Sequence, residues 1–102
     1  MFCGTPCYMD PDLVNKRKYN GQAVDIWALG VILFKLLTGQ LPFWGDTETE
    51  CNQRIQAGRY QIPPHKLISD SAKHLIKQMF KLDASKRITA KKILEHPWLQ
   101  DN

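Results

Sequence analysis

One run of apolar residues constrains this chain more than any other feature. Twelve of the fifteen side chains in residues 23–37 are apolar, and they do not keep to one stripe of a helix. A helix that is apolar all round must be surrounded by protein. Three β-branched residues make a buried strand an alternative, but fifteen residues are too many for a typical strand. Because Gly39 offers a left-handed helix stop, the sequence predicts a central helix over residues 22–38.

A second helix is predicted by its capping residues. Thr47 to Glu50 read Thr-Glu-Thr-Glu, the form of a capping box, and the acids also suit the positive end of a helix dipole. We expect a helix over residues 48–57 that stops at Gly58. Its apolar stripe is thin, so this helix should lie on the outside and be lightly attached.

The clearest helical periodicity lies further along the chain. Apolar residues recur there at i, i+3, i+4, i+7 and i+8, namely Ala72, Leu75, Ile76, Met79 and Phe80. This spacing predicts a helix over residues 70–81. A last helix over residues 90–96 should begin after Thr89 and be closed by Pro97. No stretch alternates with period two for long enough to form a sheet, so the predicted fold is all-α.

Composition favours one soluble globular domain. The chain has 102 residues, 43% apolar and 24% charged, which suits a single modest core. The net charge of +4 is spread along the sequence, and Lys16-Arg17-Lys18 is the one tight basic run. Three basic residues without interleaved aromatics do not make a nucleic-acid reader, so we expect no nucleic-acid partner.

The cysteines indicate a reducing compartment. Cys3, Cys7 and Cys51 are odd in number and irregularly spaced, unlike a disulfide framework, and they lack the second close pair that a zinc site needs. Residues 1–10 have no signal-peptide pattern, and the apolar run is shorter than the ~20 residues that cross a bilayer. We therefore expect a cytoplasmic or nuclear protein, with no membrane partner and no metal.

Three separated segments, taken in order, resemble protein Ser/Thr kinases. Residues 2–12 (Phe-Cys-Gly-Thr-Pro-Cys-Tyr-Met-Asp-Pro-Asp) resemble the end of an activation segment, G-T-x-x-Y-x-A-P-E. Residues 25–30 match the D-x-W-x-x-G of the central helix in the kinase large lobe. Residues 83–89, followed by His96-Pro97-Trp98, match the arginine loop and last helix of that lobe. The sequence of these segments is most similar to the calmodulin-dependent and AMP-activated branch of the protein kinases.

The resemblance implies a partial kinase C-lobe. Residues 1–12 would be the substrate loop, and the last four helices of the lobe would follow. The Gly-rich loop, the His-Arg-Asp catalytic loop and the metal-holding Asp-Phe-Gly do not occur in the sequence. We therefore expect no catalytic residue and no cofactor in this chain, with Mg-ATP bound only by an intact parent kinase.

The resemblance also implies roles for the first loop. The threonine that matches Thr5 hydrogen-bonds the catalytic aspartate and lysine of Ser/Thr kinases; the bland alternative is a turn residue before Pro6. The pocket for the substrate residue after the phosphorylated one would be formed by Cys3, Gly4, Thr5, Pro6, Cys7 and Tyr8. Asp10 departs from the small residue usual at its position, so substrate preference does not carry over.

Five further residues would support the lobe. Trp27 and Gly30 would belong to its core, and Asp25 would accept hydrogen bonds from a catalytic loop that this sequence lacks, or would simply be an acid favoured by the helix dipole. The family also pairs a glutamate, here Asp12, with an arginine, here Arg87, in a buried ion pair. We expect Asp12 and Arg87 to pair; the alternative for Arg87 is a solvated loop charge.

Two classes of function follow. The chain is a fragment of a protein Ser/Thr kinase that carries the substrate-positioning loop, or it is a non-catalytic binding module or pseudokinase remnant that docks protein partners. In both, the partner is a protein substrate or a regulatory protein. Since the usual neighbours of the central helix are missing, several hundred Å² of apolar surface should be exposed.

Overall fold

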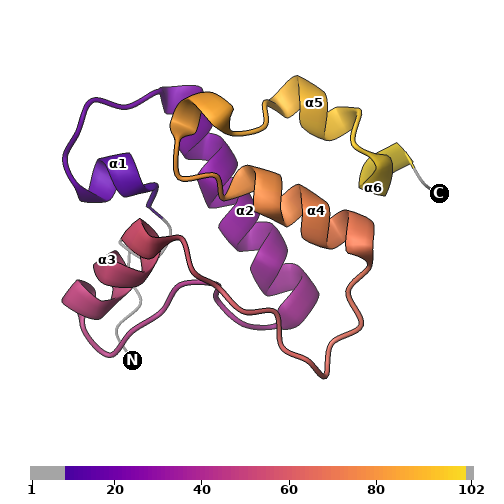
Figure 1. Ribbon diagram of the computed structural model, residues 1–102, viewed down its shortest axis with the longest axis horizontal. Helices are drawn as coiled ribbons and strands as arrows, with labels where there is room; N and C mark the ends of the chain where they lie inside the picture. Colours follow the sequence, from indigo (N-terminus) through magenta and orange to yellow (C-terminus); the bar gives the residue numbers. More distant parts are fainter. Residues whose placement is uncertain (1–8, 101–102) are drawn as a thin grey trace.

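A single long helix, α2 (Gly21–Thr38), crosses the molecule and organises the other elements (Figure 1). The computed structural model describes residues 9–100. The remaining elements are α1 (Pro11–Val14), α3 (Glu48–Ala57), α4 (Asp70–Met79), the 3₁₀ turn η2 (Ala84–Lys86), α5 (Ala90–Leu94) and α6 (Pro97–Gln100). Helices and loops account for all of residues 9–100, without a strand, so the predicted all-α class is confirmed.

The ends of α2 are fixed by local chemistry. Asn20 caps its start, because the side-chain oxygen accepts hydrogen bonds from the backbone N–H groups of Gln22 and Ala23 at 2.9 and 3.2 Å. Gly39 ends the helix with φ of 78°, a left-handed conformation that costs glycine little, and its N–H donates to the Lys35 carbonyl.

Helix α3 has the bounds that its capping signals indicate. The Thr47 hydroxyl accepts a hydrogen bond from the Glu50 N–H at 3.1 Å. The Glu50 carboxylate reaches back to the N–H of Asp46, one residue before the cap, also at 3.1 Å. Although α3 lies at one side of the fold, Cys51 and Ile55 are fully buried, so it is more firmly attached than its thin apolar stripe suggests.

Two elements differ from expectation. Pro97 does not close the last helix; α5 ends at Leu94, and Pro97 begins the separate helix α6. Proline is favoured at a first helical position because its missing N–H is not needed there. The short helix α1 was not predicted, although Asp10-Pro11 is a cap followed by a first-turn proline.

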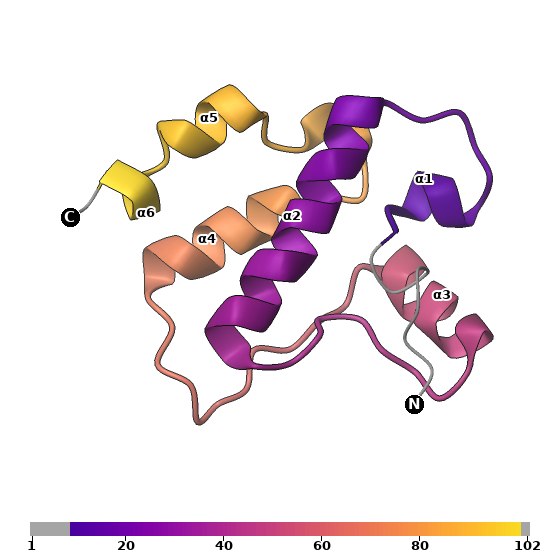
Figure 2. The same cartoon turned by 180° about the vertical axis from the view of Figure 1, so that it is seen from behind.

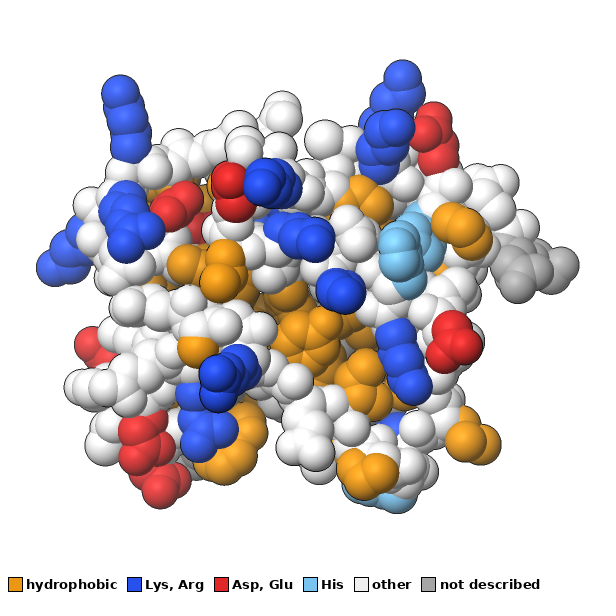
Figure 3. Space-filling model, in the orientation of Figure 1, with side chains coloured by type: hydrophobic (Ala, Val, Ile, Leu, Met, Phe, Trp, Pro, Cys, Tyr) orange, Lys and Arg blue, Asp and Glu red, His pale blue; other side chains and the backbone are white. Residues whose placement is uncertain are grey.

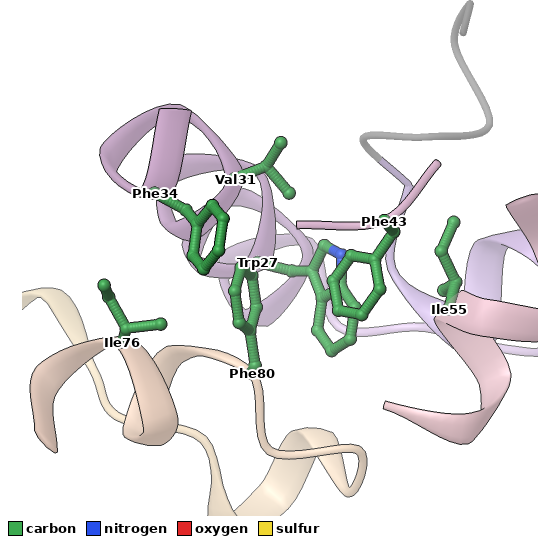
Figure 4. Close-up of a cluster of buried hydrophobic side chains, with 7 residues drawn as sticks. All are labelled: Trp27, Val31, Phe34, Phe43, Ile55, Ile76 and Phe80. Carbon is green, nitrogen blue, oxygen red and sulfur yellow. The ribbon is translucent and has the colours of Figure 1, made fainter. Parts of the chain in front are cut away.

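The core lies where α2 and α4 cross and where the two long loops fold back. Its main cluster combines residues from α2, the loop after it, α3 and α4 with its cap residue: Trp27, Val31, Phe34, Phe43, Ile55, Ile76 and Phe80 (Figure 4). Phe43 stacks on the Trp27 ring with centroids 5.3 Å apart, and Phe80 is tilted against the same ring at 5.0 Å. Aromatic pairs at these separations add to the stabilisation that burial provides. A second cluster, made of Ile26, Leu75, Met79 and Ile93, joins α2 to α4 and α5.

Gly30 permits the close approach of α2 to the end of α4. A Cβ atom at this position would lie 2.9 Å from the Phe80 ring and 3.1 Å from the Met79 Cβ. Contacts this short would push the two helices apart. The glycine of the D-x-W-x-x-G segment is therefore a packing requirement at the helix crossing.

The other side of α2 is open. Leu29, Ile32 and Leu36 are 44%, 49% and 78% exposed, and together with Asp25 they form one stripe, which we call the open face. In the view from behind, α2 is in the foreground with no other helix in front of it (Figure 2). Within residues 9–100 no segment packs on the open face, so the helix is not surrounded there; exposed apolar surface was expected, because the usual neighbours of this helix are missing.

The same helix has the length and mean hydropathy, 1.4, of a candidate membrane span within the described residues. Core helices of soluble proteins can have the same length and mean hydropathy. Trp27, Val31 and Phe34 are fully buried against other parts of this chain, which is the behaviour of a core helix. On the face shown in Figure 3, Lys and Arg are interspersed with Asp and Glu and do not gather in one patch.

Candidate functional site

The candidate site consists of the elements that would support the substrate loop. The loop residues Cys3, Gly4, Thr5, Pro6, Cys7 and Tyr8 lie outside the described residues, so their predicted roles stay predictions. Asp10, the second described residue, lies near the N-terminal end of α2, because Arg87 donates hydrogen bonds both to Asp10 and to the Ala23 carbonyl. The supporting residues are all described.

Asp10 has two roles at this point. Its side chain caps α1, where Oδ1 accepts hydrogen bonds from the N–H groups of Asp12 at 2.6 Å and Leu13 at 3.4 Å. Its other carboxylate oxygen, Oδ2, pairs with the Arg87 guanidinium. Asp10 and the Arg87 side chain are both completely buried. A buried carboxylate is tolerated when it is paired and its oxygens accept hydrogen bonds, and Asp10 meets both conditions.

Arg87 ties three segments together: the residue before α1, the first turn of α2 and the chain that follows α4. Its Nε donates to the Lys81 carbonyl at 2.9 Å, and one terminal nitrogen donates both to Asp10 and to the Ala23 carbonyl, the latter at 2.8 Å. The other terminal nitrogen is 3.4 Å from the Leu82 carbonyl oxygen. The rigid, planar fork of arginine suits such a set of acceptors, whereas a lysine offers a single point charge. Arg87 is thus a structural tie and not a solvated loop charge.

The predicted partner of Arg87 was wrong. Asp12 lies in the first turn of α1, with its carboxylate 3.7 Å from Arg17, an arginine that is 66% exposed. Asp10 is the cap residue and has an extended backbone, whereas Asp12 is helical, so their side chains point in different directions and only that of Asp10 reaches Arg87. The Asp10-Pro11 pair was the signal that could have identified the correct acid, because a cap aspartate is fixed in direction by the amides it binds.

Trp27 is central to the support. Its ring centroid lies 5.0 Å from the Arg87 guanidinium carbon, and the same ring stacks on Phe43. A guanidinium near an indole ring gains cation–π attraction. The indole Nε1 is buried and has no hydrogen-bond partner among the described residues. Trp27 therefore connects the Arg87 tie to the aromatic core.

Asp25 lies at the edge of the open face. Its side chain is exposed, and within residues 9–100 it makes no ion pair or hydrogen bond. Beside it, a hollow of about 500 Å³ is lined by the start of α2 and by residues 84–91. A carboxylate in this position is available to a partner that donates hydrogen bonds.

The turn before Arg87 is held by a short cap. Asp83 accepts hydrogen bonds from the Ser85 N–H at 3.0 Å and from its hydroxyl at 2.7 Å. These hydrogen bonds, the hydroxyl bond foremost, lower the pKa of Asp83. The negative carboxylate thus stabilises η2, which delivers Arg87 to the core. No three His, Cys, Asp or Glu residues in the described part of the chain gather as metal ligands would.

The fold and this site together define part of the helical lobe of a protein kinase. The chain belongs to the protein kinase family, since the model of the protein kinase domain matches residues 1–99. Together with relatives that are Ser/Thr kinases, this match confirms the predicted resemblance.

Three relatives illustrate the match. The chain is 47% identical over 98 residues to the probable serine/threonine-protein kinase MARK-A of Dictyostelium discoideum, which covers 96% of this chain and 9% of that protein. It is 44% identical to mouse serine/threonine-protein kinase 33, covering 98% of the chain and 21% of the relative. It is also 44% identical to the calcium/calmodulin-dependent protein kinase type II alpha chain of Drosophila melanogaster, covering 96% and 19%. The chain thus spans about a fifth or less of the length of these relatives.

Proposed function

We propose that this chain is the substrate-side half of the helical lobe of a protein Ser/Thr kinase, and that phosphoryl transfer also requires the catalytic half of that kinase. The open face of α2 is the observation that carries the proposal. It presents Leu29, Ile32 and Leu36 to solvent beside the carboxylate of Asp25, which has no partner within residues 9–100. An apolar stripe next to a hydrogen-bond acceptor suits a docked protein segment that has both apolar side chains and free backbone N–H groups.

The Asp10–Arg87 pair favours the same role. It fixes the chain at Asp10, so a protein substrate bound by the preceding residues would lie next to a rigid support. Rigid supports are what positioning requires, because phosphoryl transfer depends on placing the reactants and neutralising charge. We infer that the loop formed by residues 3–8 contacts a Ser- or Thr-containing protein substrate.

The residues of this chain do not fit Mg-ATP. Phosphates and their magnesium need a Gly-rich backbone cradle, a lysine and metal-binding carboxylates. The six glycines are never spaced as in such a cradle. Within residues 9–100, Asp25 does not belong to a group of three or more His, Cys, Asp or Glu residues that could hold a metal ion. We therefore propose that the intact parent binds Mg-ATP with residues that this chain does not contain.

A second candidate function is a non-catalytic module that docks protein partners. It is favoured by a hollow of about 510 Å³ between the loop that follows α2 and the loop that follows α3. Arg54 lies over the Trp44 ring at 4.3 Å on its wall, and Arg59 adds a second positive charge. This combination suits an acidic protein segment with an apolar side chain.

A domain chimera distinguishes the two candidates. In the Drosophila relative, the matching segment is replaced by residues 1–99 of this chain, and transfer of phosphate from ATP to a Ser-containing peptide is measured. We expect a folded, active chimera, with activity lost when Leu29, Ile32 and Leu36 are all changed to Lys. A chimera that folds and binds ATP but transfers no phosphate would favour the docking module.

The isolated chain provides a second test. Mg-ATP should leave its melting temperature unchanged, because a ligand stabilises only a state that binds it. A clear, saturable rise would contradict the absence of a nucleotide site. Mg-ADP and magnesium alone are the matched controls for a non-specific salt effect.

A further inference from the structure

Two histidines join α4 to the end of the chain. His74 on α4 and His96, between α5 and α6, have their Nδ1 and Nε2 atoms 2.9 Å apart. The ring centroids are 5.1 Å apart and the interplanar angle is 27°, so the two rings are nearly parallel and meet at their nitrogen atoms. His96 is 6% exposed, whereas His74 is exposed. In Figure 3, histidine atoms lie at the right of the molecule, over the region where α4 and α6 lie in Figure 1.

The hydrogen bonds assign the protons of this pair. The backbone N–H of Trp98 donates to His96 Nδ1 at 3.1 Å, so that nitrogen carries no hydrogen. A neutral imidazole then has its hydrogen on Nε2, which donates to His74 Nδ1. His74 Nδ1 is therefore the acceptor, and its own hydrogen is on Nε2. This chain of bonds, from Trp98 through both rings, requires that both histidines be neutral.

An added proton breaks the chain of bonds at either ring. A proton on His74 Nδ1 would face the N–H of His96 Nε2, and a proton on His96 Nδ1 would face the Trp98 N–H. Burial lowers the pKa of His96, and a charge on His74 lowers it further. The closed arrangement thus resists protonation.

Other charges near the pair do not offset this effect. The ionisable neighbours along α4 are Asp70, Lys73 and Lys77, and those beside His96 are Lys92 and Glu95. None of them makes an ion pair with either ring within residues 9–100. Burial and His74 remain the two influences that lower the pKa of His96.

We propose that the His74–His96 pair is a proton-sensitive latch, which holds the C-terminal segment, residues 90–100, against α4 near neutral pH and releases it in acid. Within this segment, Ile93 is a buried member of the second core cluster and Trp98 packs against that cluster. Release would expose part of that cluster, including Leu75 and Met79 of α4. The latch would make docking of residues 90–100 depend on pH without a change elsewhere in the core.

The same proton positions argue against a metal at the pair. A metal would need the lone pair of His96 Nε2, but this nitrogen carries the hydrogen as long as Nδ1 accepts from Trp98. Only two rings meet at the site, and structural zinc sites usually use four ligands.

The sign of the pH dependence follows from the lowered pKa. A released His96 titrates near the ordinary value of 6.5, while in the latch its pKa lies below that value. Below pH 6.5 the released form binds more protons, so the latch weakens as pH falls and is fully closed above that range.

Hydrogen exchange of the Trp98 amide in the full 102-residue chain tests the latch. After correction for intrinsic exchange rates, we expect its protection to fall about fivefold on acidification, as for the loss of one hydrogen bond. His74→Asn keeps an acceptor at the same place but cannot be protonated, so its loss of protection should begin at lower pH. His65→Gln, at an exposed loop histidine, is the matched control and should behave as the unaltered chain.

Two results would overturn the latch. One is an unchanged acid response in His74→Asn. The other needs no variant: nitrogen NMR at neutral pH should find the His96 hydrogen on Nε2, and a hydrogen on Nδ1 would contradict the bond network. This second measurement stands even where a variant does not fold.

Discussion

The two sides of α2 consist of similar apolar residues but lie in different environments. On the inner side, Trp27, Val31 and Phe34 are fully buried; on the open face, Leu29, Ile32 and Leu36 are 44–78% exposed. The inner side is completed by α4, by the loops and by the Asp10–Arg87 tie. A helix with apolar residues on all sides is suited to being covered by protein on all sides. The contrast shows that such a pattern does not tell whether the residues of one chain provide all of that cover.

Loss of the Arg87 tie should have the largest effect on the inner side. Arg87→Ala leaves the buried Asp10 carboxylate without its charge partner, which we expect to lower the free energy of unfolding by about 3–5 kcal/mol. Urea denaturation at neutral pH measures the change. Arg17→Ala removes an exposed arginine of the same region and should change stability by no more than about 1 kcal/mol.

The aspartates provide the reciprocal comparison for this tie. Asp10→Asn should approach the cost of Arg87→Ala, while Asp12→Asn should resemble Arg17→Ala. Equal losses for the two aspartate variants would contradict the assignment of Asp10 as the partner of Arg87.

Truncation of two isoleucines on α2 compares its two sides directly. Ile26 is 6% exposed and belongs to the second cluster, whereas Ile32 is 49% exposed. We expect Ile26→Ala to cost about 2–5 kcal/mol and Ile32→Ala well under half of that, because only the first leaves a cavity. Both variants change the same residue type in one helix, so helix propensity cancels in the difference. Similar costs would mean that the open face is covered in solution.

An alanine at Gly30 should also separate a crowded position from an open one. Its Cβ would press on Phe80 and Met79, an overpacking cost of about 1–3 kcal/mol. Gly21→Ala is the control, since a Cβ there meets no atom within 4 Å. Relative to that control, thermal unfolding should occur at lower temperature for Gly30→Ala. If Gly30→Ala is as stable as Gly21→Ala, α2 and α4 can move apart at their crossing with little loss of stability.

Sequence patterns predicted the parts of the fold that depend on local rules. The all-round apolar run, the capping residues Thr47 and Thr89, and the stop glycines Gly39 and Gly58 located the helices to within a few residues. Such signals work because they concern the backbone groups at helix ends, which must be satisfied within a few residues of sequence.

The remaining features depend on contacts that sequence spacing does not encode. Which of Asp10 and Asp12 meets Arg87 is decided by the direction of a cap residue, 77 residues away from the arginine. The bond between His74 and His96 likewise joins residues 22 positions apart with no recognisable spacing. The open face could be anticipated only as an amount of exposed surface, because periodicity does not say which neighbour is missing.

The smallest expected effect on stability is at Asp25, which sharpens the contrast with Asp10. Asp25→Asn removes a charge that is exposed and has no partner within residues 9–100, so the free energy of unfolding should stay within about 0.5 kcal/mol. In the chimera with the Drosophila relative, the same substitution should lower phosphoryl transfer, because the carboxylate would there accept hydrogen bonds from the catalytic half. Urea denaturation of the chain and peptide phosphorylation by the chimera measure the two effects. If the Asp25→Asn chimera is stable and transfers phosphate as fast as the chimera without the substitution, the open face of α2 does not bind the catalytic half through this carboxylate.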